Sequence, residues 1–166
     1  MSGEPKLALA EEPELFERAC AFAATATARL RSLLGPDAEI THVGATAVPD
    51  CLTKGDVDIV VRVDRGAFPS ARATLDAHYE KNIGSPRDDR FASFTDETGA
   101  FPLGIQLVVR GSQYDSFKDF SDLLRASETL RASYNALKRS FVGADMETYR
   151  KAKADFIERT LAGSNP

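Results

Sequence analysis

Residues 56–63, DVDIVVRV, constrain the fold more than any other segment, because they predict a β-strand that starts with two acidic residues. Apolar side chains recur at every second position, which is typical of a strand with one buried face. Residues two apart in a strand point to the same side. Asp56 and Asp58 are therefore expected to project together, away from the apolar set, which consists of Val57, Ile59, Val61 and Val63.

The rest of the chain predicts a sheet followed by helices. Beyond Gly111, apolar residues at helical spacing predict three helices, with Ser127 and Asp145 as N-caps of the second and third. Before that point, the predicted helices cover 13–34 and 70–78, and the predicted strands cover 39–43, 56–63, 90–95 and 101–110.

The order of these elements indicates the fold class. The length of 166 residues is close to the common size of one domain. We expect one α+β domain over 1–166, with a mixed β-sheet flanked by helices in 1–110 and a helical C-terminal part in 111–166.

Composition excludes some classes of protein. The 21 basic and 25 acidic side chains are well mixed and give a net charge of -4, which argues against sequence-independent binding of nucleic acid. Residues 1–10 lack the apolar core of a signal peptide, and no apolar run is long enough to span a membrane. Cys20 and Cys51 lack a metal-binding spacing and are expected to be reduced. A cytoplasmic protein is therefore expected.

The acidic pair suggests a metal site. Two adjacent carboxylates repel each other unless a cation neutralises them. Mg²⁺ does this well, because it is commonly held between one or two carboxylates and substrate phosphates. Upstream, Gly44 lacks a Cβ and would let backbone N–H groups approach a phosphate, and Thr46 adds a hydroxyl. This combination is typical of phosphoryl or nucleotidyl transfer.

A simpler interpretation of the same residues stays open. The stretch KGDVD can form a turn with Gly55 and Asp56 at its tip, and Asp58 would then lie on a solvated strand face. An Asp-x-Asp pair alone is a weak signal.

Several motifs together resemble a known family. The GA at 44–45 and the DVDI at 56–59 are similar to the signature of the polymerase β-like nucleotidyltransferase superfamily. Within that superfamily the chain resembles the GrpB family. The motifs that carry the resemblance are HVGATAVP, GSQYDSFKDFSDLLRAS, YNALKRSF and YRKAKADFI, and they span residues 42–157.

The resemblance implies a nucleotidyltransferase-like fold and a Mg²⁺-dependent enzyme that acts on a nucleoside triphosphate. Asp56 and Asp58 would be the catalytic metal ligands, and Gly44 and Thr46 would receive the phosphates. The acidic balance of the chain favours a small-molecule acceptor over nucleic acid. The partner is thus a nucleoside triphosphate or another phosphorylated small molecule.

Four further residues are candidates for contact with the nucleotide. His42 would contact a base or phosphate, or it is a strand histidine bonded to backbone. Lys54 would touch a phosphate or pair with Asp56. Arg125 and Lys138 would close over the triphosphate, or they lie on a solvated helix face. Lys153 has the same two interpretations and ranks below them.

Two positions depart from the family pattern. Ala45 stands where the family often has Ser, which removes a hydroxyl. Gln106 stands on the third strand, where active superfamily members usually place a third carboxylate. Its amide could hold a water or touch a cation, but it is not a general base. A non-catalytic module that binds a nucleotide or phosphometabolite is therefore the alternative, and a partner-binding protein with a vestigial cleft is a third possibility.

Overall fold

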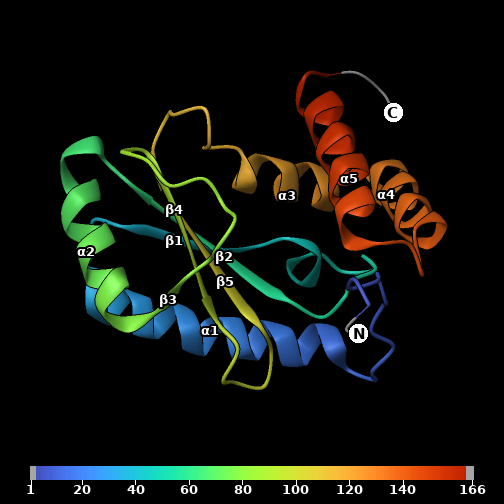
Figure 1. The fold of residues 1–166 in the computed structure, drawn as a ribbon, viewed down its shortest axis with the longest axis horizontal. Coiled ribbons are helices and arrows are strands. Elements are labelled where there is room, and N and C mark those ends of the chain that lie inside the picture. Colours follow the sequence, from blue (N-terminus) through green and yellow to red (C-terminus); the bar gives the residue numbers. More distant parts are fainter. Residues whose placement is uncertain (1–2, 164–166) are drawn as a thin grey trace.

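The computed structural model describes residues 3–163, and Figure 1 shows a sheet with helices around it. The sequence predicted every strand except the short β3. The structure starts the second helix two residues earlier than predicted, and Asp56 lies just outside its strand. The elements are α1 (Leu15–Leu34), β1 (Glu39–Val43), β2 (Val57–Val63), α2 (Phe68–His78), β3 (Glu80–Lys81), β4 (Phe91–Asp96), β5 (Leu103–Val109), α3 (Phe117–Ala126), α4 (Glu128–Ser140) and α5 (Met146–Leu161).

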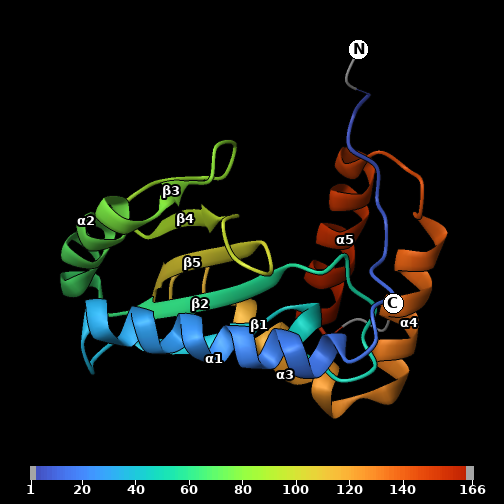
Figure 2. The ribbon, with the colours of Figure 1, turned by 90° about the horizontal axis from the view of Figure 1, so that it is seen from below.

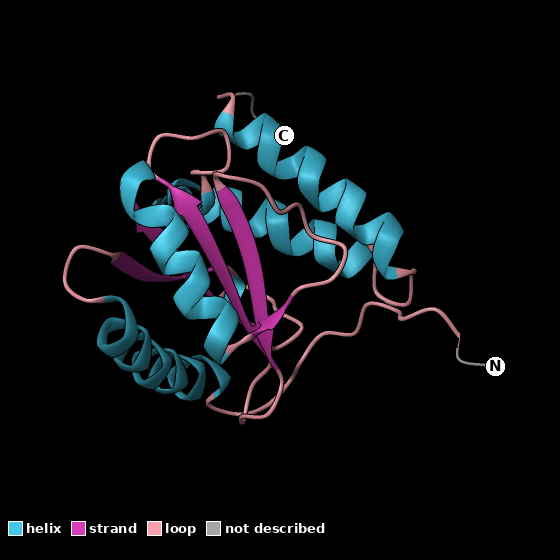
Figure 3. Ribbon diagram, turned by 60° about the vertical axis from the view of Figure 1, so that its left-hand side comes forward, coloured by secondary structure: helices cyan, strands magenta, loops and turns pink. Residues whose placement is uncertain are grey.

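The five strands form one mixed sheet in the order β1-β2-β5-β4-β3. Strands β2 and β5 are parallel, and the other neighbouring pairs are antiparallel. Asp58 pairs with Gly104 across the parallel pair, and Val60 pairs with Gln106. The predicted mixed sheet with flanking helices is confirmed (Figure 3).

One face of the sheet carries the main core. Alternate residues of β2, β4 and β5 are buried there against α1 and α2, as the alternation in the sequence predicted. Figure 2 shows α1 lying along this layer, with α2 at one end. The strand residues in this core are Val57, Ile59, Val61, Val63, Ala92, Phe94, Leu103, Ile105, Leu107 and Val109.

The opposite face is divided into an apolar part and a polar part. Val60 and Val108 belong to a small apolar cluster against which Phe117 packs. Asp58, Gly104 and Gln106 alternate with the core residues of their strands, so they lie on this second face. The C-terminal helices pack beside it through a cluster that contains Val48, Phe120, Leu124, Tyr134 and Phe156.

The N-terminal segment was not predicted to be ordered against the rest of the chain. Residues 5–10, which we call the strap, run along α5 before the chain reaches α1 (Figure 2). Lys6 forms an isolated antiparallel bridge with Asp145, and Leu7 is buried. Within residues 3–163, no helix is long and apolar enough to cross a membrane.

Candidate functional site

The carboxylate of Asp58 lies between two glycines. A Cβ added to Gly44 would lie 2.9 Å from Oδ2 of Asp58, and a Cβ added to Gly104 would lie 2.8 Å from Oδ1. Real Cβ atoms do not approach that closely, so both positions need glycine for this arrangement. The sequence singled out Gly44 for its access to a phosphate, but its immediate neighbour is the acidic side chain itself.

Burial changes the ionisation of Asp58. The loss of solvent around its carboxylate raises the pKa, although part of the residue stays open to a hollow. Lys153 opposes that rise most strongly, whereas Asp56 adds to it by repulsion. A buried carboxylate with a raised pKa is characteristic of functional sites, because charge is held there at a cost in stability.

Asp56 lies in the same small hollow as Asp58. The residue precedes β2, and its carboxylate pairs with Lys54 at 2.7 Å. The hollow has a volume of about 30 Å³. Its lining residues are Leu7, Leu9, Ala45, Thr53, Lys54, Asp56, Asp58, Lys138, Tyr149 and Lys153. The two acids therefore line one hollow, as the sequence predicted. Of the two interpretations of Lys54, the structure has the ion pair with Asp56.

Two lysines from different helices reach this hollow. Lys138 comes from α4 and Lys153 from α5, and each follows a tyrosine of its own helix by four residues. Residues four apart lie on one helix face, so the buried Tyr134 and Tyr149 place both amines on the inward side. Lys138 is buried, so it does not lie on a solvated helix face, and Lys153 is half-buried.

Lys138 is almost fully enclosed, with 3% of its surface exposed. Its Nζ donates to the carbonyl oxygen of Leu52, lies 3.7 Å from Sγ of Cys51, and lies 4.1 Å from the ring centroid of Tyr134. Burial lowers the pKa of Lys138 to about 8, and the positive charge of Lys153 adds to that effect.

The turn after β1 is held from α3. The N–H of Gly44 donates to Oγ of the buried Ser121 at 2.9 Å. Arg125 donates to the carbonyl oxygens of Ala47 at 3.3 Å and of His42 at 3.5 Å. The Gly44 amide is thus engaged within the protein, and Arg125 fixes the turn instead of lining the hollow around Asp58.

His42 lies on the other face of the sheet from Asp58. It pairs with Ile59, a residue of the main core, so its ring projects toward α1. The hydroxyl of Thr46 donates to the carbonyl oxygen of Asp56 at 3.0 Å. Because that hydroxyl has one hydrogen, it accepts from Nε2–H of His42, 2.9 Å away. Burial, together with Arg125, lowers the pKa of His42 to about 4, so the ring is neutral at pH 7.

A second hollow, with a volume of about 270 Å³, adjoins Asp58. Gln106 lines it together with Asp58 and Lys153, and side chains from β1, α3, α4 and α5 form an apolar wall. The residues of that wall are Val43, Phe117, Phe120, Leu124, Tyr134 and Ile157.

Sequence reasoning missed or ranked low three contributors to the site. Lys153 was placed below Lys138, yet it lines both hollows beside Asp58. Ser121 belongs to no motif, although it lies four residues after Phe117 on the apolar stripe of its helix. The strap carried no motif at all.

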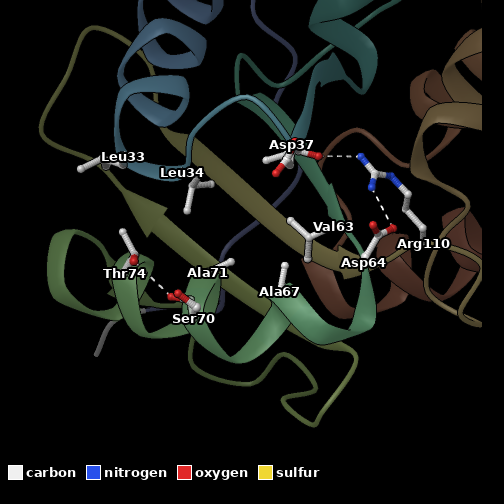
Figure 4. Close-up of a pocket in the computed structure, with 11 residues that line it drawn as sticks. Leu33, Leu34, Asp37, Val63, Asp64, Ala67, Ser70, Ala71, Thr74 and Arg110 are labelled. Atoms are coloured by element: carbon white, nitrogen blue, oxygen red, sulfur yellow. Dashed lines mark hydrogen bonds and ion pairs between the residues drawn. The ribbon is translucent and has the colours of Figure 1, made fainter.

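A larger hollow, about 380 Å³, lies away from the acidic pair, between α1, α2 and the end of β2 (Figure 4). Two of its charged groups, Arg110 and Asp64, form an ion pair with each other. Arg110 donates to Asp64 and to the carbonyl oxygen of Asp37, each at 2.9 Å (Figure 4). None of the residues expected to be functional lines it, so its size alone does not make it the site.

The donor set at Asp56 and Asp58 suits one type of metal. Across residues 3–163, no three His, Cys, Asp or Glu side chains gather closely enough to hold an ion by themselves. Two carboxylates that share a hollow fit Mg²⁺, which takes one or two protein carboxylates and completes its shell with water and substrate phosphates. A closed structural zinc site would need four protein ligands.

Comparison with other proteins gives relatives over most of the chain. The family model for GrpB protein matches residues 15–162. A UPF0157 protein of Vibrio cholerae is 34% identical over 127 residues, which cover 76% of this chain and 67% of that protein. A UPF0157 protein of Streptomyces coelicolor is 32% identical over 135 residues, which cover 78% of this chain and 70% of that protein.

Solved structures share the fold. The crystal structure of the conserved protein GrpB from Enterococcus faecalis aligns with a TM-score of 0.61 at 14% identity, covering 93% of this chain and 99% of that one. The Cid1 poly(U) polymerase with MgGTP bound aligns with a TM-score of 0.52 at 18% identity, covering 78% of this chain and 42% of that one. The predicted nucleotidyltransferase-like fold is confirmed.

Proposed function

The chain belongs to the GrpB family, and on that premise we propose that it is a Mg²⁺-dependent nucleotidyltransferase acting on a nucleoside triphosphate and a small-molecule acceptor. The observation that carries the proposal is the convergence of Asp56 and Asp58 with Lys138 and Lys153 in one hollow. Carboxylates and ammonium groups gathered there complement a metal and the phosphates that accompany it.

Asp56 and Asp58 would hold the Mg²⁺, since their carboxylates line the same hollow. The cation, when bound, neutralises negative charge on the phosphates. The two glycines that flank Asp58 keep its carboxylate in one position. Lys54 would turn from Asp56 toward a phosphate when the metal takes its place beside that carboxylate.

Lys138 and Lys153 would balance charge on the phosphate chain from the side of the C-terminal helices. The apolar hollow of about 270 Å³ next to Asp58 is large enough for an organic group of the substrate. Gln106 would hydrogen-bond to that group through its amide. Neither His42 nor Arg125 is given a substrate contact, because both act on the turn that carries Gly44.

The proposed location is the cytoplasm. Cys20 and Cys51 are both unpaired, which fits a reducing compartment.

Thermal-shift measurements with a panel of nucleoside triphosphates, with and without Mg²⁺, test the proposal. A ligand at a hundred times its Kd stabilises by about 2.7 kcal/mol, which raises the Tm of a domain of this size by several degrees. We expect a shift that needs both nucleotide and Mg²⁺, together with release of pyrophosphate when the acceptor is present. A panel that leaves the Tm unchanged contradicts the proposal.

Gln106 favours a second candidate, a module that binds a nucleotide or phosphometabolite without turnover. A neutral amide beside Asp58 supplies no general base for an attacking hydroxyl. A Mg²⁺-dependent shift without pyrophosphate release, whatever acceptor is supplied, is the result expected of that module. The variant Gln106→Asp then separates the two, because a site that lacks only a carboxylate should gain some turnover.

A further inference from the structure

We propose that the strap, residues 5–10, is an autoinhibitory segment that closes the acidic hollow and must leave before a nucleotide binds. The part of this inference that concerns nucleotide binding rests on the proposed function. Leu7 and Leu9 of the strap line the same hollow as Asp56 and Asp58. They are apolar, whereas five other residues of the lining carry charge.

The space beneath the strap is too small for a substrate. The hollow has a volume of about 30 Å³, whereas pockets that hold small molecules usually have about 300–1,000 Å³. A triphosphate with its metal needs far more room. Asp58, Lys138 and Lys153 are fixed on β2, α4 and α5, whereas Leu7 and Leu9 belong to a segment outside these elements. A substrate would therefore enter by displacing the strap.

The strap is held by one buried side chain and by backbone hydrogen bonds. Leu7 is 3% exposed and packs with Met146 and Tyr149. Its N–H donates to the carbonyl oxygen of Ala144 at 2.9 Å, and its carbonyl oxygen accepts from Gly143 N–H at 2.9 Å. The strap is thus one short extended segment without a neighbour in the five-stranded sheet.

Two more hydrogen bonds fix the ends of the strap. The N–H of Met146 donates to the carbonyl oxygen of Pro5 at 3.0 Å. The N–H of Ala10 donates to the carbonyl oxygen of Thr53 at 2.9 Å. The residues that match the GrpB family begin at 15, after the strap. The strap therefore lies outside the matched residues, and it packs against Met146 and Tyr149 within them.

The test compares two leucine truncations. Leu7→Ala loosens the strap, and Leu75→Ala removes the same atoms from the core between α2 and the sheet. A chain lacking residues 1–10 serves as a second form without the strap. Two quantities are measured for each protein. The first is the Kd for ATP with Mg²⁺. The second is the rate at which an amine-reactive reagent labels Lys138, measured by mass spectrometry with the exposed Lys151 as internal control.

We expect Leu7→Ala and the shortened chain to label faster at Lys138 and to bind ATP with Mg²⁺ more tightly, and Leu75→Ala to do neither. If the strap is open in about a tenth of molecules, its loss tightens binding about tenfold. Unchanged labelling of Lys138 without the strap overturns the inference. Faster labelling with no ATP binding in any variant supports the strap as a cover and contradicts the proposed function.

Discussion

Asp58 and Gly104 face each other across the parallel pair of β2 and β5, and the carboxylate occupies the space that a side chain on Gly104 would fill. The Gly104→Ala variant should therefore displace the carboxylate. The Oδ1 atom of Asp58 lies at the end of a side chain that can rotate. We therefore expect the variant to lose about 0.5–1.5 kcal/mol of stability, the cost of a strained rotamer. ATP affinity in the presence of Mg²⁺ should fall much further. Gly66→Ala is the control, since no atom lies within 4 Å of its added Cβ.

Gly44 offers a matched comparison with Gly35. Their backbone angles are nearly identical, with φ 80° and ψ -174° at Gly44 and φ 81° and ψ -175° at Gly35. Alanine in that region costs about 1–3 kcal/mol at either site. An added Cβ meets Asp58 at Gly44 and open space at Gly35. Urea denaturation should show a larger loss for Gly44→Ala, and only that variant should lose ATP binding. Equal effects would mean that the approach to Asp58 is unimportant.

Sequence patterns predicted the sheet and the acidic pair because both depend on local periodicity. The alternation in residues 56–63 fixed which side chains of β2 enter the core, and that left Asp58 on the second face. Alternation in residues 39–43 shows only that Ile40 and His42 share one face of β1. Which face turns to the core depends on the pairing of His42 with Ile59, and the sequence does not show that pairing.

Other features of the site depend on packing between distant segments. Ser121 bonds to Gly44 across 77 positions of the chain, and the strap reaches Ala144. No local pattern announces such contacts. The burial of Lys138 had a local signal, because it follows Tyr134 by four residues, but the depth of that burial depends on Leu52 and the loop before β2.

Lys138 should make stability rise with pH. Its pKa is lowered to about 8 from an ordinary value of 10.5. Between these values the unfolded chain binds a proton that the folded protein lacks, so the free energy of unfolding increases as pH rises. The total effect is on the order of 3 kcal/mol. Urea denaturation from pH 7.5 to 10 should show this increase in the wild type and a flatter profile in Lys138→Met. Parallel profiles would contradict the burial of the amine.

His42 should make the protein sensitive to mild acid. Its pKa is lowered to about 4 from 6.5, so between these values the unfolded chain again holds the extra proton. The free energy of unfolding should therefore decrease as pH falls from 6.5 to 4. His42→Gln keeps an N–H donor for Thr46 but does not titrate. The difference between the two proteins isolates this histidine from the carboxylates that titrate nearby. It should grow as pH falls below 6.5 and level off below about pH 4.

The Asp58→Asn variant tests the central claim most directly, because stability and binding should move in opposite directions. The pKa of Asp58 is raised by burial, so its negative charge destabilises the folded protein above the ordinary pKa of an aspartate. The neutral amide has the same shape and should leave the free energy of unfolding unchanged or higher at pH 7.

Calorimetric titration of ATP with Mg²⁺ into both proteins is the deciding measurement. The wild type should bind, and Asp58→Asn should lose Mg²⁺-dependent binding while remaining at least as stable. Equal affinity in the two proteins would contradict a metal and nucleotide site at this carboxylate.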